Sequence, residues 1–171
     1  FLFDGNYFIE PFDSLGAWTN TVLSTEYQGA WSIDNSGYNG SSAKSVVEAS
    51  GHGDRLSKRF IFTDQSIISL WIKRSTDDPI KLYIKGRSTT DSNNNFDTLL
   101  DDPGTNWTNR LKIIESGEYD IYVETNEKGT AWIDELQVFT NTRPIVLLSS
   151  PSSPATNTSP IRVDISFSKD F

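Results

Sequence analysis

The chain consists of short runs in which apolar and polar residues alternate, separated by clusters of Gly, Asn, Asp, Ser and Pro. A period of two is typical of a strand with one buried face, whereas an amphipathic helix needs a period near 3.6. The runs rich in β-branched and aromatic residues predict ten strands: Tyr7–Phe12, Trp18–Val22, Ala30–Ile33, Ala43–Val47, Leu56–Phe62, Ile67–Lys73, Ile80–Ile84, Asn109–Ile114, Glu118–Glu124 and Ala131–Phe139. The sequence therefore predicts an all-β fold, a sandwich of two antiparallel sheets. The polar stretch Gly86–Asn95 is expected to form a long exposed loop.

Charge and composition exclude several classes of function. The net charge of −8 argues against binding to nucleic acid or to an anionic membrane surface, because both need clustered Lys and Arg. The absence of cysteine excludes disulfides and thiolate metal sites. No run approaches the 18 apolar residues or so of a membrane-spanning helix, so no membrane insertion is expected. We expect an extracellular or cell-surface domain, secreted as a piece of a longer protein.

The composition changes after Thr140, where Pro, Ser, Thr and Asn become frequent. Proline removes a hydrogen-bond donor from a β-ladder, so this segment cannot continue a central strand. Two later runs, Ile145–Leu148 and Ile161–Phe167, are expected to be strands of their own. We predict a sandwich domain over residues 1–140, followed over residues 141–171 by a linker and the first strands of an incomplete second domain.

The last strand of the predicted sandwich contains an unusual acidic residue. With a period of two, Asp134 shares one face with Trp132, Leu136 and Val138, and this face is expected to point into the core. A buried carboxylate is costly unless it is hydrogen-bonded, paired or bound to a metal. Calcium is one candidate, because it takes oxygen ligands and tolerates backbone carbonyls. The alternative is that Asp134 accepts backbone N–H groups or pairs with an arginine.

The order of these segments resembles the jelly-roll domains of bacterial extracellular proteins, the group that holds calcium-containing carbohydrate-binding modules and MAM-type adhesion domains. The resemblance rests on these pieces: Ile9–Ser14 followed by Trp18, Trp31–Ile33, Ser36–Ser42, Ile68–Lys73, Leu82–Ile84, Trp107, Ser116–Tyr119 and Ala131–Leu136. It implies a structural calcium held by Asp134, by Asp13 or Glu10 of the first strand, and by carbonyls near Gly37–Ser41.

The C-terminal segment has a resemblance of its own. Arg143–Leu147 and Thr158–Ser168 resemble the opening of a bacterial Ig-like repeat, which usually serves as a spacer in adhesins and large secreted enzymes. The similarity covers two strands, so it indicates the context of the domain more than its chemistry.

Aromatic side chains in loop-like segments are the candidates for binding a carbohydrate or cell-surface glycan, because their rings can serve as platforms for sugars. The candidate ligand-binding residues are Tyr27, Tyr38, Phe96 and Trp107. Packing inside a loop is the alternative for each of them. Three tryptophans within strand patterns, Trp18, Trp71 and Trp132, are expected in the core.

Three classes of function are compatible with the sequence. A non-catalytic carbohydrate-binding module and a structural or adhesive spacer explain the sequence about equally well. An enzyme explains little, since the single histidine, His52, has no recognisable partner residues, and the acidic pairs Asp77–Asp78 and Asp101–Asp102 stand beside proline in turn-like segments. We therefore expect no catalytic residues.

Overall fold

The computed structural model describes residues 2–3, 8–23, 30–75, 79–100, 104–140, 147–149 and 164–166. The chain divides into two compact units, Phe1–Thr140 and Asn141–Phe171. In the second unit β13 (Leu147–Ser149) pairs antiparallel with β14 (Asp164–Ser166). The other residues that resemble an Ig-like repeat lie outside the described residues, so that assignment stays a prediction.

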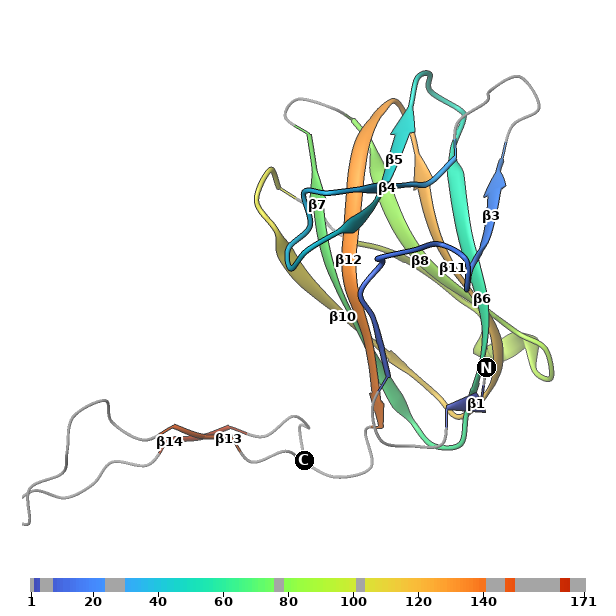
Figure 1. Cartoon of the computed structure of the whole chain (residues 1–171). Coiled ribbons are helices and arrows are strands. Elements are labelled where there is room, and N and C mark those ends of the chain that lie inside the picture. The colour runs from blue at the N-terminus through green and yellow to red at the C-terminus, as the bar shows by residue number, and fades with distance from the viewer. Residues whose placement is uncertain are drawn as a thin grey trace, which may run out of the picture. The chain divides into compact units, whose positions relative to one another are not determined.

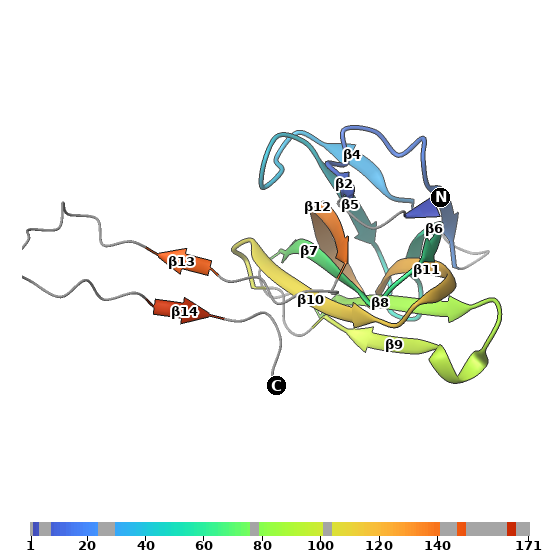
Figure 2. The same cartoon turned by 90° about the horizontal axis from the view of Figure 1, so that it is seen from below.

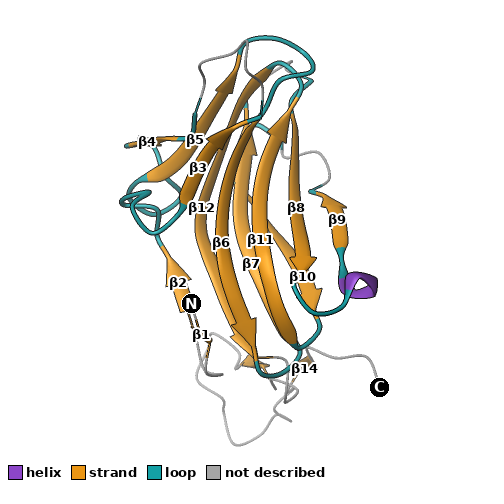
Figure 3. Cartoon of the chain, turned by 90° about the vertical axis from the view of Figure 1, so that its right-hand side faces the viewer, coloured by secondary structure: helices purple, strands orange, loops and turns teal. Residues whose placement is uncertain are grey.

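The first unit is a sandwich of two six-stranded sheets (Figures 1 and 2). The first sheet has the order β1-β6-β11-β8-β9, with β3 also beside β6 (Figure 3). Its strands are β1 (Leu2–Phe3), β3 (Thr19–Val22), β6 (Asp54–Phe62), β8 (Lys81–Ser88), β9 (Phe96–Leu99) and β11 (Gly117–Asn126).

The second sheet has the order β10-β7-β12-β5-β4, with β2 also beside β12. Its strands are β2 (Phe8–Glu10), β4 (Ser32–Asp34), β5 (Ser42–Val47), β7 (Ser66–Arg74), β10 (Thr108–Ile114) and β12 (Gly129–Thr140). Among the described strands every pair is antiparallel except β1 with β6. From β5 to β8 and from β9 to β12 the chain crosses between the sheets at each step. This is a jelly roll, which confirms the predicted fold.

The core lies between the two sheets and is built from alternate residues of the long strands. Leu56, Phe60 and Phe62 of β6 point inward, as do Leu70 and Ile72 of β7. The register sets these residues against inward residues of the neighbouring strands in each sheet. The predicted core position of Trp18 is correct, because its side chain is buried in this cluster.

The closing strand β12 differs from its predicted pattern. Its register with β7 shifts between Asp134 and Gln137, and Glu135 adopts a positive φ of 42°. Such a β-bulge inserts an extra residue and reverses the alternation of the faces beyond it. Ile133 therefore points inward before the bulge, and Leu136 and Val138 point inward after it.

This bulge corrects two sequence-based expectations. Asp134 does not share the core face of Leu136 and Val138, although it is fully buried. Trp132 is half-buried and lies outside the core cluster. Trp71 is also half-buried and outside the cluster, and it stands opposite Asp134 where β7 pairs with β12. Both tryptophans thus lie on the outer face of the second sheet.

The expected loop Gly86–Asn95 is in part a strand. β8 continues to Ser88 because its ladder with β11 extends that far, and the turn η1 (Ser92–Asn94) then leads into β9. Gly86 is required there, since a Cβ atom would lie 2.2 Å from the ring of Phe96. Within the described parts of the chain no helix is long and apolar enough to cross a membrane.

A second buried aspartate lies between the sheets. The backbone N–H of Asp54 donates to Thr125 Oγ1 at 3.2 Å, and Ser45 Oγ donates to Asp54 Oδ2 at 2.6 Å. The hydroxyls of Ser45 and Thr125 are 2.8 Å apart. Asp54 Oδ1 has no partner among the described residues, and burial raises the pKa of this carboxyl.

Candidate functional site

The outer face of the first sheet carries a layer of charged and tyrosine side chains. Because Leu56, Phe60, Ile121 and Val123 point inward, the residues between them on β6 and β11 point outward. The same alternation turns alternate residues of β8 outward. The outward residues are Arg55, Ser57 and Arg59 of β6, Asp120, Tyr122 and Glu124 of β11, and Tyr83, Lys85 and Arg87 of β8.

Glu124 is the central acidic group of this face. Its side chain is 4% exposed, and it pairs with Arg55 of β6 and with Lys85 of β8. The register sets Glu124 opposite Arg55 of β6 and opposite Tyr83 of β8, and Lys85, which stands opposite Tyr122, reaches Glu124 diagonally. The Arg55 guanidinium carbon lies 4.6 Å from the ring centroid of Tyr122, and Lys85 Nζ lies 5.2 Å from the ring centroid of Tyr83. Two cations and two tyrosines therefore surround one carboxylate.

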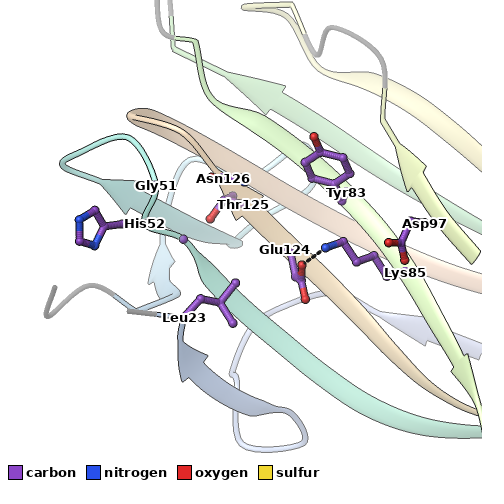
Figure 4. Close-up of a pocket in the computed structure, with 10 residues that line it drawn as sticks. Leu23, Gly51, His52, Tyr83, Lys85, Asp97, Glu124, Thr125 and Asn126 are labelled. Carbon is purple, nitrogen blue, oxygen red and sulfur yellow. Dashed lines mark ion pairs between the residues drawn. The ribbon is translucent and has the colours of Figure 1, made fainter. Parts of the chain in front are cut away.

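Two hollows lie along β11 on this face. One, of about 280 Å³, is lined by Glu124 with Tyr83, Lys85 and Asp97 on one side and Leu23 and His52 on the other (Figure 4). The other, of about 360 Å³, is lined by Tyr122, Asp120 and Arg59 together with Thr19 and Ser57. Sites for small molecules are hollows in which a few fixed polar groups set the orientation of the ligand. Both hollows contain such fixed polar groups, although polar side chains make up most of their lining.

The acidic groups of this face are held as hydrogen-bond acceptors. A bidentate pair with Arg59, at 2.8 and 2.9 Å, lowers the pKa of Asp120. The hydrogen bond from Arg87 likewise lowers the pKa of Asp97. A glycosidase needs one carboxylic acid with a raised pKa to protonate the leaving group. Asp97 and Asp120 have the opposite property, so neither fits the role of that acid.

The structure brings two of the predicted ligand-binding residues together on the other sheet. Tyr38, in the loop between β4 and β5, stacks on Trp71 with ring centroids 3.8 Å apart and planes 10° apart. Trp107, just before β10, meets Tyr38 edge-on at 6.4 Å. The Tyr38 side chain is 46% exposed, so one face of this cluster is open to solvent.

The other predicted residues lie elsewhere. Phe96 covers Gly86 and packs against Tyr119 with ring centroids 6.3 Å apart, at the edge of a third hollow, of about 300 Å³, that Arg87 and Asp97 also line. His52 lines the hollow of about 280 Å³ that Glu124 also lines. Tyr27 and the acidic pairs 77–78 and 101–102 lie outside the described residues.

The loop that carries Tyr38 is attached to Asp134. Asp134 Oδ2 accepts from the Asn39 backbone N–H at 2.9 Å, and Oδ1 accepts from the Glu135 N–H at 2.7 Å. Asn39 Nδ2 also donates to Glu135 Oε1. Burial raises the pKa of Asp134, and these backbone hydrogen bonds oppose that rise. This matches the hydrogen-bonded alternative for Asp134 that the sequence left open.

The two carboxylates expected to join Asp134 have other surroundings. Glu10 Oε2 accepts from Trp18 Nε1 at 3.0 Å and lies 3.6 Å from Lys58 Nζ. Asp13 is exposed. Within the described residues, no group of three or more His, Cys, Asp or Glu side chains could hold a metal ion. A metal at Asp134 would therefore depend on backbone and hydroxyl oxygens.

Sequence reasoning missed the face built around Glu124. Its residues were assigned to strands, but alternation within single strands does not show which strands become neighbours. The available signal was the series Asp120, Tyr122 and Glu124, which are polar positions between apolar ones on one strand. That series indicates a solvent-facing row without naming its partners.

Comparison with known proteins supports the fold. No family model matches the chain, and no curated protein matches it. Bacteriophage CBA120 tailspike protein 4 has a TM-score of 0.59 at 13% identity over 74% of this chain, which spans only 20% of that chain. A family 61 carbohydrate-binding module solved with β-1,4-galactotriose has a TM-score of 0.57 at 14% identity, over 74% of this chain and 90% of its own.

A third similar structure is the family 11 carbohydrate-binding module from Clostridium thermocellum, solved with a β-1,3-1,4-mixed-linked tetrasaccharide. Its TM-score is 0.57 at 10% identity, over 80% of this chain and 96% of its own. At such identities the likeness concerns the fold, and function depends on the site.

Proposed function

We propose that this chain is a non-catalytic carbohydrate-binding module that binds a β-linked polysaccharide on the outer face of its first sheet. The observation that carries the proposal is the buried Glu124, fixed by Arg55 and Lys85 between Tyr83 and Tyr122 on a hollowed face. Charged side chains that their ion-pair partners already hold in place can form hydrogen bonds with sugar hydroxyls without changing conformation. Tyrosine rings offer apolar faces to the C–H side of a sugar.

The similar modules solved with oligosaccharides support this choice of ligand class. Binding along β11 would let one sugar chain reach both hollows, since Tyr122 and Glu124 line one hollow each. We further propose that the module acts outside the cell as part of a longer secreted protein, because long polysaccharides are met there. A spacer with no ligand is the competing function.

Binding to soluble polysaccharide tests this proposal. β-1,4-Galactan and mixed-linkage β-glucan should retard the protein in affinity electrophoresis, and Tyr83→Ala and Tyr122→Ala should each weaken binding at least ~10-fold, as loss of a central aromatic contact does. Leu111→Ser is the matched control, because Leu111 is 62% exposed on the second sheet, and this variant should bind like the parent. Unchanged binding by both tyrosine variants would remove this face as the site, and no binding of either polysaccharide would favour the spacer.

We also propose a structural calcium at Asp134. Two features fit a cation: the carboxylate is fully buried, and no Lys or Arg of the described residues pairs with it. Ser42 Oγ is buried and has no hydrogen-bond partner among the described residues, and the pairing of Ala43 with Ile133 sets Ser42 beside Asp134. Asp134, Ser42 and carbonyls of Gly37–Ser41 would supply the oxygens, with Asp13 the remaining acidic candidate. Glu10 is held by Lys58 instead.

Calcium removal is expected to lower the melting temperature, because a ligand that binds only the folded state stabilises it. Melting should be followed in excess EDTA and again after calcium is restored. At a free calcium concentration on the order of 100 times the dissociation constant, calcium binding should raise the free energy of unfolding by about 2.7 kcal/mol. Magnesium is the control ion, since it demands a stricter octahedral geometry. Identical melting curves with EDTA and with calcium would exclude a structural calcium and leave the backbone hydrogen bonds as the sole support of Asp134.

A further inference from the structure

The outer face of the second sheet holds a group of four aromatic side chains, Tyr38, Trp71, Trp107 and Trp132, which we call the aromatic cluster. Trp71 lies on β7 and Trp132 on β12, while Tyr38 and Trp107 approach from loops at that face. The bulge at Glu135 keeps Trp132 outside the core, and the stack on Trp71 holds Tyr38. The cluster belongs to a different sheet from the hollows along β11.

Lys73 lies between two of these rings. Its Nζ is 4.7 Å from the ring centroid of Trp107 and 4.7 Å from that of Trp132. No carboxylate of the described residues pairs with Lys73. The neighbouring Lys44 differs, because it forms an ion pair with Asp34 at 3.4 Å. Without a carboxylate partner among the described residues, the ammonium of Lys73 on this aromatic face is available to an external anion.

A second polar group of the cluster also lacks a partner. Trp132 Nε1 is buried and makes no hydrogen bond with the described residues. An indole N–H donates only, and a buried donor without an acceptor costs about 1–3 kcal/mol. A bound acceptor that reached it would relieve this cost. The cluster therefore offers an ammonium and the open ring of Tyr38 on one surface, with the indole N–H buried beneath it.

We propose that the aromatic cluster binds a uronic acid residue of an anionic polysaccharide. The carboxylate would accept hydrogen bonds from Lys73 Nζ, and the C–H face of the pyranose ring would pack on Tyr38 and Trp107. A neutral sugar would leave the ammonium unpaired, and an inorganic anion would leave the aromatic surface exposed. A uronic acid satisfies both, because it joins one negative charge to one apolar face.

Titration with oligogalacturonate tests the inference by tryptophan fluorescence, since three tryptophans belong to the cluster. Both titrations use the Tyr83→Ala variant, in which sugar binding to the first sheet is weakened. The fluorescence spectrum should change on addition of oligogalacturonate and stay constant on addition of galacto-oligosaccharide. Lys73→Met keeps the apolar stem without the charge and should weaken binding at least ~10-fold, whereas Lys73→Arg should restore most of it. Tyr38→Ala should weaken binding while leaving the melting temperature within a few degrees of the parent.

Several results would overturn the inference and leave the first-sheet proposal intact. One is equal binding of oligogalacturonate by Lys73→Met and the parent. Another is loss of that binding in Tyr83→Ala alone, which would assign the anionic sugar to the first sheet. A third is an equal response to sulfated galactose or inorganic sulfate, which would show a site for anions in general. Absence of any response would mean that Lys73 only packs over the tryptophans.

Discussion

Replacement of Asp134 by alanine is expected to lower the free energy of unfolding by about 1–3 kcal/mol, because two backbone N–H groups in part-buried hydrogen bonds lose their acceptor. These are the N–H groups of Asn39 and Glu135. Asp134→Asn should cost less than alanine, since its amide keeps one acceptor oxygen while the –NH₂ faces the other N–H. Urea unfolding followed by circular dichroism measures both values.

The control for Asp134 is Glu48→Ala, because Glu48 is exposed at the end of β5 and should change stability by less than about 0.5 kcal/mol. The loop between β4 and β5 provides a second readout. Loss of its attachment to Asp134 should release Tyr38 from Trp71 and alter tryptophan fluorescence before global unfolding. An alanine variant as stable as the control would show that the loop holds without Asp134.

Replacement of the other buried aspartate is expected to have the opposite effect. Asp54→Asn should raise the free energy of unfolding by about 1–3 kcal/mol at a pH above the folded pKa of Asp54, since it removes an unpaired buried charge and keeps an acceptor for Ser45. Asp54 accepts fewer hydrogen bonds than its two oxygens allow, and no Lys or Arg of the described residues pairs with it. The charge, rather than the shape of the side chain, is therefore the destabilising element.

The pH dependence follows from the raised pKa of Asp54. In the folded state the carboxyl holds its proton above the unfolded value of 3.8, so the unfolded chain binds fewer protons in that window and stability falls as pH rises through it. Below pH 3.8 both states are protonated and the charge costs nothing. The advantage of Asp54→Asn should thus be full above the folded pKa and vanish in acid.

A matched control reverses the sign. Arg59 lowers the pKa of Asp120, so Asp120→Asn should leave stability unchanged or lower it by up to about 1 kcal/mol at neutral pH, as for other solvent-exposed ion pairs. Melting of the three proteins from pH 3 to pH 8 makes the comparison. A constant gap between Asp54→Asn and the parent across this range would contradict a titrating Asp54.

Alternation of residue types was sufficient to predict the sandwich and most of its strands. All ten predicted strands occur, with shifted ends, and the long ones carry their apolar residues on a face that the other sheet covers. β9 (Phe96–Leu99) was missed because only four residues pair at the edge of the first sheet. The bulge was missed because bulges are usually signalled by glycine at a positive φ, and here Glu135 takes that conformation.

The candidate sites were predictable to different degrees. Tyr38 and Trp107 could be named from their loop-like surroundings, although their meeting on Trp71 depends on tertiary structure. The group of Arg55, Lys85 and Glu124 could not be named, because three strands distant in sequence must become neighbours in one register. Ion pairs across such a sheet leave no local pattern in any one strand.

The bulge in β12 adds one residue to a strand that would otherwise alternate without interruption. Deletion of Glu135 would bring both halves of the strand into the same phase, and Ile133, Leu136 and Val138 would still face the core. The hydrogen bond from Asn39 to Glu135 would be lost with the residue. The extra residue therefore serves the attachment of the loop between β4 and β5 rather than the core, and related chains are expected to lose the residue and this attachment together.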